Sequence, residues 1–267
     1  MKFNEVKDAN EPKICIYAVG HKAFEMPMQD SFYVPLMVGN QYEQLPQWGY
    51  ADNIGENISA KNKRYNELTG LYWIWKNSDA EIVGLCHYRR YFITLEGKIR
   101  NVLFGEKTGF LDSFYIRKTL SKYDVILHNK TLTLKGNQNQ LCFREDQKDN
   151  IRKNKLDRRI LDISDNIFES FYPQDMKIYR SVMRRKYAHL LNMMICRKKV
   201  ADRYCEWLFP LLEGIEEEAE RRYPESEHER LLGLLAERLL DVWVLKEKLR
   251  VKECFTLNVE NVDWKIW

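Results

Sequence analysis

The chain has 267 residues, of which 45% are hydrophobic and 13% aromatic, enough for one large or two small domains with a sizeable core. A formal net charge of +4 is too weak to indicate a nucleic-acid-binding protein, but it suits an acidic small ligand or an anionic membrane surface. We find neither a signal peptide nor an apolar run that could span a membrane, which predicts a cytoplasmic protein that reaches membranes only from their surface.

The six cysteines include no closely spaced pair of the CxxC type. Cys15, Cys86 and Cys196 lie inside apolar runs and are expected to be small core residues. This pattern is typical of a reduced compartment and agrees with a cytoplasmic location.

The first predicted strand spans residues 13–19 and runs into a basic turn, Gly20-His21-Lys22. A strand that enters a glycine-containing basic turn is the usual start of a nucleotide-binding α/β unit. A second apolar segment follows at 32–38, and residues 49–59 form an irregular stretch rich in Gly and Asn.

A helix is predicted over residues 61–76, because apolar side chains recur there at helical spacing. Asn57 and Ser59 are candidate caps for its start. We expect Trp73, Trp75 and Trp207 to belong to the core.

The most informative stretch is a short apolar run, residues 82–86, that ends abruptly in His87-Tyr88-Arg89-Arg90. The run reads as a buried strand, and ligands of open α/β sheets bind where such strands end. Guanidinium groups suit phosphate and do not ligate cations, so an anion site is favoured over a metal site. We also expect Tyr88 and Tyr91 to face the ligand. The alternative is a surface strand end with ordinary solvated charges.

Residues 97–109 are interpreted as a flexible connection and residues 123–127 as another strand. The span 129–159 is polar and poorly periodic, which is typical of a solvated helix face or a loop. A membrane-surface or acceptor-binding role for it is the alternative.

Residues 190–196 are predicted to form a strand, and residues 201–222 and 228–245 two amphipathic helices. In the second helix, Gly233, Glu237 and Asp241 share the face opposite the leucines. The glycine would let another backbone or a ligand approach the carboxylates, unless this is simply an exposed acidic face. The strand–helix alternation predicts an α/β fold with a mostly helical C-terminal part.

Seven blocks of this sequence, in this order, resemble one known family: the bacterial capsular and exopolysaccharide biosynthesis glycosyltransferases, long catalogued as a domain of unknown function. The similarity covers residues 13–243. The blocks are residues 16–22, 52–59, 62–76, 83–92, 192–195, 204–209 and 233–240.

The resemblance implies a GT-A-like fold in a single domain, residues 13–250, preceded by an extension at 1–12. Within it, residues 13–128 would bind the nucleotide sugar, 129–185 would form a divergent segment, and 186–250 a helical half. The span 129–175 departs from the family because it lacks histidine and is rich in Lys, Asn and Gln, which leaves the acceptor open. For the tail, 251–267, a docked strand, a membrane contact and a dimer contact are the alternatives.

The function implied is transfer of a hexosyl unit from a UDP-sugar, UDP-galactofuranose being one candidate donor, to a growing saccharide. The acceptor would be lipid-linked or free, and the enzyme would work in the cytoplasm or at the inner face of the plasma membrane. The alternative is a non-catalytic nucleotide- or saccharide-binding subunit of a polysaccharide assembly complex. No nucleic-acid partner is expected.

The resemblance also assigns roles to individual residues. Glu237 is the candidate base in an inverting reaction, with Asp52 in reserve. The chain has no Asp-x-Asp pair, so we predict a metal-independent site, with Mg²⁺ or Mn²⁺ held by residues far apart in sequence as the alternative. The donor-binding residues are Gly20, His21 and Lys22 near the nucleotide, Asp52, Gly55 and Asn57 at the nucleoside or sugar, and His87, Tyr88, Arg89 and Arg90 at the diphosphate.

Overall fold

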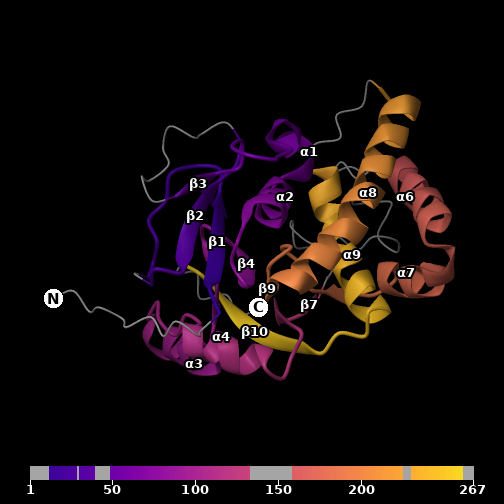
Figure 1. Ribbon diagram of the computed structural model, residues 1–267. Coiled ribbons are helices and arrows are strands. Elements are labelled where there is room, and N and C mark those ends of the chain that lie inside the picture. The colour runs from indigo at the N-terminus through magenta and orange to yellow at the C-terminus, as the bar shows by residue number, and fades with distance from the viewer. Residues whose placement is uncertain (1–11, 29, 40–48, 133–157, 225–229, 261–267) are drawn as a thin grey trace.

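A mixed eight-stranded sheet runs through the computed structural model, which describes residues 12–28, 30–39, 49–132, 158–224 and 230–260 (Figure 1). One half of the sheet is parallel. It consists of β1 (Ile14–Gly20), β2 (Tyr33–Met37), β3 (Tyr50–Ala51) and β4 (Ile82–His87). The other half consists of β5 (Arg90–Ile93), β6 (Val125–His128), β9 (Met194–Arg197) and β10 (Val251–Asn258).

The strand order is β3-β2-β1-β4-β5-β10-β6-β9, and β4 also pairs with β9. The hydrogen bonding therefore closes a ring of five strands, β4, β9, β6, β10 and β5. A separate two-stranded sheet joins β7 (Thr131–Leu132) to β8 (Tyr187–Ala188).

Helices cover both faces of the sheet (Figure 1). On one face lie α2 (Leu68–Asn77), α6 (Arg158–Phe171), α7 (Met176–Met183), α8 (Lys198–Arg222) and α9 (Leu231–Lys246). The other elements are η2 (Ser59–Lys61), α1 (Asn62–Tyr65), α3 (Leu95–Phe104), α4 (Ser113–Leu120) and η3 (Pro173–Asp175), with α4 on the opposite face.

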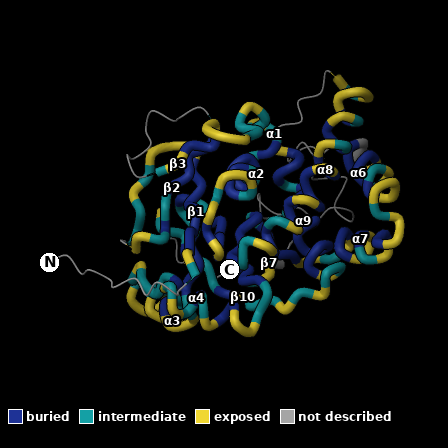
Figure 2. The backbone as a smooth tube through the Cα atoms, viewed as in Figure 1, coloured by how far each residue is buried: buried dark blue, intermediate teal, exposed yellow. Residues whose placement is uncertain are grey.

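Strand β1 is buried on both sides, as Figure 2 shows. Its side chains alternate: Tyr17 and Val19 enter the core under α2, α8 and α9, while Ile16 and Ala18 enter the core under α4. A strand buried on both faces reads as a continuous apolar run, which is why the sequence reveals it. The predicted core roles of Trp73 and Trp207, and of Cys15, Cys86 and Cys196, are confirmed by their burial.

The helix predicted over residues 61–76 is interrupted. Asn66 has φ 51°, and Glu67 precedes a new helix, α2. The side chains of Asn62 and Thr69 both donate to the carbonyl of Asn66, so they satisfy the acceptor that the break exposes. The break turns Glu67 away from a regular helical path.

The prediction of a flexible connection over residues 97–109 is wrong, because α3 occupies most of it. Thr94 caps this helix by accepting from Gly97 N, and Gly105 ends it in the left-handed region. A Cβ on Gly97 would lie 2.6 Å from the carbonyl oxygen of Thr108, so glycine permits this close approach of two backbones.

Residues 251–258, assigned from the sequence to a tail beyond the domain, form the inner strand β10 between β5 and β6. The docked-strand alternative is thus correct for residues 251–258. Of the polar span 129–159, residues 133–157 lie outside the described residues. None of the helices in the described part of the chain is both long and apolar enough to cross a membrane.

Candidate functional site

The parallel strands β1, β2, β3 and β4 all end at one edge of the sheet. Their register pairs Val19 with His87, and Met37 with both Gly20 and Ala51. The residues that follow these strands must therefore meet at this edge, which is where ligands bind in open α/β sheets. The structure brings together the two predicted basic segments, Gly20-His21-Lys22 and His87-Tyr88-Arg89-Arg90.

The ring of Tyr88 organises these basic residues. It contacts the His21 ring edge-on with centroids 5.4 Å apart, and Lys22 Nζ and Arg89 Cζ lie 5.2 and 5.5 Å from its centroid. Such cation–π contacts hold two positive charges beside one aromatic ring. Tyr88 itself is buried, and Tyr91 is fully buried with its hydroxyl donating to the Tyr88 carbonyl at 2.9 Å. The expectation that Tyr91 faces a ligand is wrong, because it is core.

A carboxylate bridges the two exposed cations. Glu260, two residues beyond β10, pairs with Lys22 at 3.0 Å and with Arg89 at 3.5 Å. The hydrogen bond from Lys22 lowers the pKa of Glu260, so the carboxylate stays ionised. The site therefore already holds one anionic group between the cations predicted to bind a diphosphate.

The loop after β3 carries three residues predicted to bind the nucleotide sugar, Asp52, Gly55 and Asn57. Some of their hydrogen bonds are made within the loop itself. Asp52 is fully buried at the end of β3. Asn57 donates to the Gly55 carbonyl and accepts from the backbone N–H of Ser59, so both ends of its amide serve the local turn. Gly55 has φ 76° and lies against the side chain of Asn77. The predicted caps are wrong: η2 begins after Ile58 and α1 after Lys61, neither with a side-chain capping hydrogen bond, and the bonds of Asn57 belong to the turn before them.

Glu237 reaches the same edge from α9. Its Oε1 accepts from the backbone N–H of Leu191 at 2.8 Å, and the Leu191 carbonyl accepts from His87 Nε2 at 2.7 Å. Burial lowers the pKa of His87, so the ring is neutral and its Nε2 carries the donated proton. The backbone of Leu191 thus links Glu237, the predicted base, to His87 in the segment predicted to bind the diphosphate.

Glu67 and Asn192 complete the cluster, and neither is a residue that the sequence predicts for the site. Asn192 Nδ2 donates to Glu67 Oε1 at 2.7 Å and to the Gly233 carbonyl at 2.9 Å. Glu67 was hidden inside a predicted continuous helix. Asn66 is the local signal in the sequence for a break in this helix, because asparagine is enriched at positive φ, where helices break.

The environment of Glu237 changes its acidity. Burial and the neighbouring carboxylate of Glu67 raise the pKa of Glu237 to about 8. Arg90 is half-buried beside the same carboxylates, and burial lowers its pKa while leaving a guanidinium that stays charged. Carboxyl groups with such raised pKa values are candidates for acid–base chemistry.

Behind this cluster, Asp241 is buried and paired with a histidine. His189 Nδ1 lies 2.5 Å from Asp241 Oδ1, and its backbone N–H donates to Oδ2 at 3.2 Å. His128 donates from Nε2 to the Leu190 carbonyl, and burial lowers the pKa of His128 to about 4. Side chains thus form hydrogen bonds along the whole segment 189–192. The alternative that Gly233, Glu237 and Asp241 form an exposed acidic face is wrong.

The shared face of Gly233, Glu237 and Asp241 is confirmed as a contact face. A Cβ on Gly233 would lie 2.8 Å from Asn66 Nδ2 and 3.3 Å from the Tyr65 carbonyl. Because Gly233 has no side chain, the break between α1 and α2 can pack directly against α9. This packing brings Glu67 toward Glu237.

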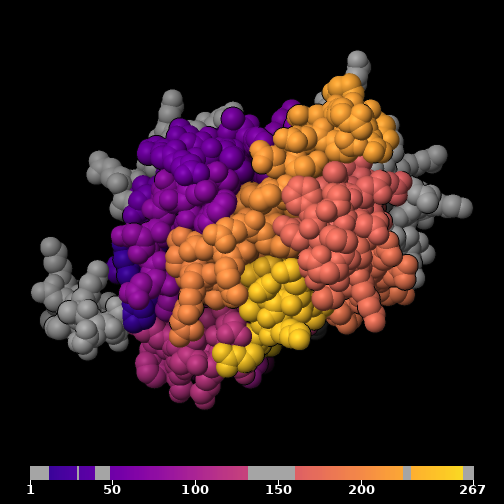
Figure 3. All heavy atoms as spheres, turned by 45° about the vertical axis from the view of Figure 1, so that its right-hand side comes forward, coloured from indigo at the N-terminus to yellow at the C-terminus, as the bar shows by residue number. Residues whose placement is uncertain are grey.

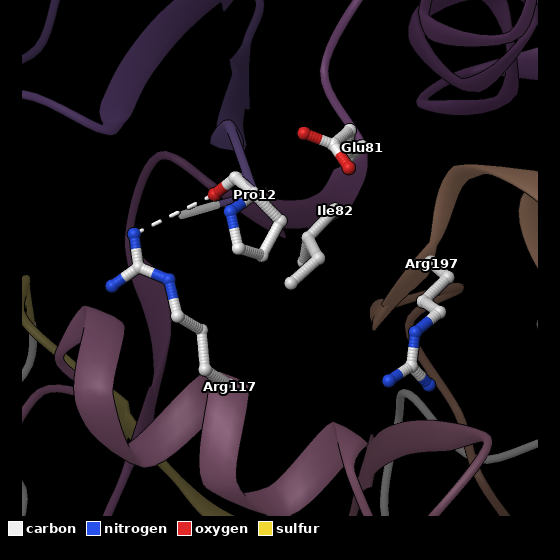
Figure 4. Close-up of a pocket in the computed structure, with 5 residues that line it drawn as sticks. All are labelled: Pro12, Glu81, Ile82, Arg117 and Arg197. Atoms are coloured by element: carbon white, nitrogen blue, oxygen red, sulfur yellow. Dashed lines mark hydrogen bonds between the residues drawn. The ribbon is translucent and has the colours of Figure 1, made fainter. Parts of the chain in front are cut away.

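A small pocket of about 100 Å³ lies at the opposite ends of the strands, at the start of β4 (Figure 4). Its arginines are engaged: Arg117 donates to the Pro12 carbonyl at 3.5 Å and Arg197 to the Leu120 carbonyl. This pocket is separate from the cluster described above. Within the described ranges, no three or more His, Cys, Asp or Glu side chains are grouped as a metal site would require.

No curated protein sequence matches the chain. A solved chain, described as the apo structure of the bifunctional glycosyltransferase WbbM, is similar with a TM-score of 0.73 and 26% identity. The match covers 93% of this chain and 46% of that one, so the chain spans less than half of that protein.

A family model described as "Domain of unknown function (DUF4422)" matches residues 15–248. This range includes all of β1 except Ile14, the basic segments, Glu67, the turn at Leu191 and α9. The protein therefore belongs to the DUF4422 family.

Proposed function

We propose that this chain is a GT-A-like glycosyltransferase that moves a hexosyl unit from a UDP-sugar to a saccharide acceptor. UDP-galactofuranose is one candidate donor, and the product would be a capsular, exopolysaccharide or related surface glycan. The similarity to a glycosyltransferase structure supports the reaction class. The single observation that carries the proposal is the joining of Glu237 to the basic strand end through Leu191.

The charges of the site suit a departing nucleoside diphosphate. In our proposal Arg89, Arg90 and Lys22 neutralise the diphosphate, and the neutral His87 serves as a hydrogen-bonding group. Fixed cations and donors can take the place of a divalent metal in stabilising this leaving group. The diphosphate would displace the carboxylate of Glu260, which bridges Lys22 and Arg89.

In an inverting transfer, the acceptor hydroxyl oxygen forms a bond to the anomeric carbon of the donor. The bond from that carbon to the phosphate oxygen breaks, and UDP leaves with the electron pair. The hydroxyl proton passes to the Glu237 carboxylate. With a pKa of about 8, this carboxylate is a stronger base than an ordinary glutamate and is matched to neutral pH.

Thermal unfolding tests the donor site. The protein is heated with UDP, other nucleoside diphosphates or buffer, each with Mg²⁺ or with EDTA. We expect a UDP-selective rise in Tm that survives EDTA, because a ligand that binds only the native state stabilises it by mass action. A rise that requires metal keeps the transferase but overturns the role of Arg89 and Arg90. No rise with any nucleotide overturns the donor site.

Variants locate the site. Arg89→Gln and Arg90→Gln should reduce the UDP-dependent rise, whereas Arg203→Gln is the matched control, because Arg203 is an exposed residue of α8 paired with Glu247. Screening UDP-hexoses against free and lipid-linked saccharides then identifies donor and acceptor. Retained UDP binding with no transfer to any acceptor would favour the non-catalytic subunit.

A further inference from the structure

Helix α3 exposes its apolar face. Leu95, Ile99, Val102 and Leu103 are 61%, 48%, 47% and 63% exposed, and their spacing of i, i+4, i+7 and i+8 places them on one stripe. Single exposed apolar residues are common on proteins, but contiguous exposed apolar patches mark interaction sites.

The inner side of α3 explains why the stripe points outward. The helix packs through Gly97, whose backbone meets Gly109 closely, and through Asn101, whose side chain donates to the Glu106 carbonyl at 3.1 Å. Glycine and asparagine thus occupy the face that a surface helix normally fills with apolar side chains. Helix α3 is therefore oriented with its apolar stripe toward the solvent, the reverse of an ordinary amphipathic helix. The core of the protein does not bury this stripe.

Two phenylalanines extend the exposed surface. Phe104, at the end of α3, and Phe114, in α4, are each 69% exposed. Figure 1 places α3 and α4 together at the lower end of the molecule, and Figure 3 shows the same part of the chain as one magenta surface there. We call the exposed side chains of Leu95, Ile99, Val102, Leu103, Phe104 and Phe114 the apolar end face.

The segment of the chain that carries the apolar end face has a net positive charge. Residues 95–122 contain six basic and three acidic side chains. Arg100 pairs with two of the acids, Glu106 at 2.7 Å and Glu96 at 3.8 Å. Lys118 lies over the Phe114 ring at 5.6 Å, and among the described residues neither Lys98 nor Lys118 has an ion-pair partner. Exposed apolar side chains beside unpaired lysines complement an anionic lipid surface.

We propose that the apolar end face seats this protein on an anionic bilayer, with the apolar side chains between the headgroups and the lysines at the phosphates. Strand β5 leads directly from Arg90 to α3, so four residues, about 13 Å of extended chain, separate the basic site from the membrane contact. Lys107 also donates to the Val259 carbonyl, and Val259 donates to the Arg89 carbonyl, which ties this region to the site. A lipid-linked acceptor would reach the site from this surface.

Vesicle sedimentation tests the membrane contact without substrate, so the outcome is independent of the proposed catalysis. We use vesicles of phosphatidylcholine alone and of phosphatidylcholine with about one-third phosphatidylglycerol. The protein should bind the anionic vesicles at least tenfold more tightly than the neutral ones, and high salt should weaken the binding.

Exposed positions allow substitution without loss of folding. The double variant Ile99→Ser/Leu103→Ser should lose at least tenfold in vesicle affinity at unchanged Tm, and Lys98→Glu/Lys118→Glu should lose the preference for anionic lipid. The matched control is Phe171→Ser/Leu245→Ser, which alters two exposed apolar residues of α6 and α9 and should bind like the wild type.

Four outcomes would overturn the proposal. The wild type could fail to bind anionic vesicles at low salt, or Ile99→Ser/Leu103→Ser could bind as the wild type does. A wild type that dimerises without binding vesicles, and becomes monomeric in this variant, would assign the face to a second copy. Vesicle binding that appears only after removal of residues 261–267 would assign it to that segment of the chain.

Discussion

The backbone N–H of Leu191 donates to Glu237 at 2.8 Å, from a residue with φ 73°. Asn192 follows with φ 51°, so two successive non-glycine residues occupy the left-handed region. Such conformations cost energy and persist only where the surroundings impose them. Here hydrogen bonds with four side chains fix residues 189–192, namely those of His128, Asp241, His87 and Glu67. The segment fixed in this way positions Glu237.

Replacing Glu237 by Gln should abolish transfer without harming the fold. The amide oxygen still accepts from Leu191, while the base is lost, so we expect kcat to fall by about 10²–10⁴-fold with Tm and UDP binding retained. Glu217→Gln, an exposed position of α8, is the control. Full activity of Glu237→Gln would rule out the assigned base.

The rate should depend on pH through Glu237. A base with a pKa of about 8 is mostly protonated at neutral pH, so kcat/KM should rise with pH and level off above about 8. The measurement is kcat/KM from pH 6 to 9.5 with a stable donor. A profile that is flat between pH 7 and 9 would contradict this role.

Stability should show the opposite trend. Because the folded-state pKa of Glu237 lies above its ordinary value of 4.5, the native state binds more protons than the unfolded state between these values. The contribution of this group to stability is therefore fully present below pH 4.5 and is lost as pH rises through about 8. Denaturant unfolding of wild type and Glu237→Gln should diverge over this window, with the variant relatively more stable at pH 9.

Asn192 should be important for both stability and geometry. Asn192→Ala removes the side-chain hydrogen bonds to the buried Gly233 carbonyl and to Glu67 and keeps the unfavourable φ, which should cost about 1–3 kcal/mol in the free energy of unfolding. Asn192→Gly relieves the backbone strain but not the lost bonds, so it should be less destabilised than Asn192→Ala. Equal stabilities of the two variants would show that the backbone conformation contributes nothing.

Glu260 should compete with anionic ligands. Glu260→Gln removes the carboxylate that pairs with Lys22 and Arg89, so UDP affinity measured by calorimetry should rise a few-fold and depend more steeply on salt. The effect is small because all three side chains are partly exposed. Glu247→Gln, which breaks the pair with Arg203 instead, is the control. Weaker UDP binding in Glu260→Gln would place the nucleotide elsewhere.

The sequence by itself determined strands β1, β2 and β4 and the long helices α8 and α9. Continuous apolar runs and helical periodicity are local properties, readable without knowing any partner. It also identified the two basic segments, Gly20–Lys22 and His87–Arg90, each after an apolar strand, but their meeting depends on the parallel pairing of β1 with β4, which the structure shows.

Only the tertiary structure decided the rest. The break at Asn66 depends on Gly233 in α9, far along the chain, and it is this contact that delivers Glu67. The pairing of His189 with Asp241 and the insertion of β10 between β5 and β6 likewise join residues distant in sequence. The apolar spacing of α3 is present in the sequence, but its outward orientation is not, because that is set by the packing of Gly97 and Asn101 against the rest of the fold.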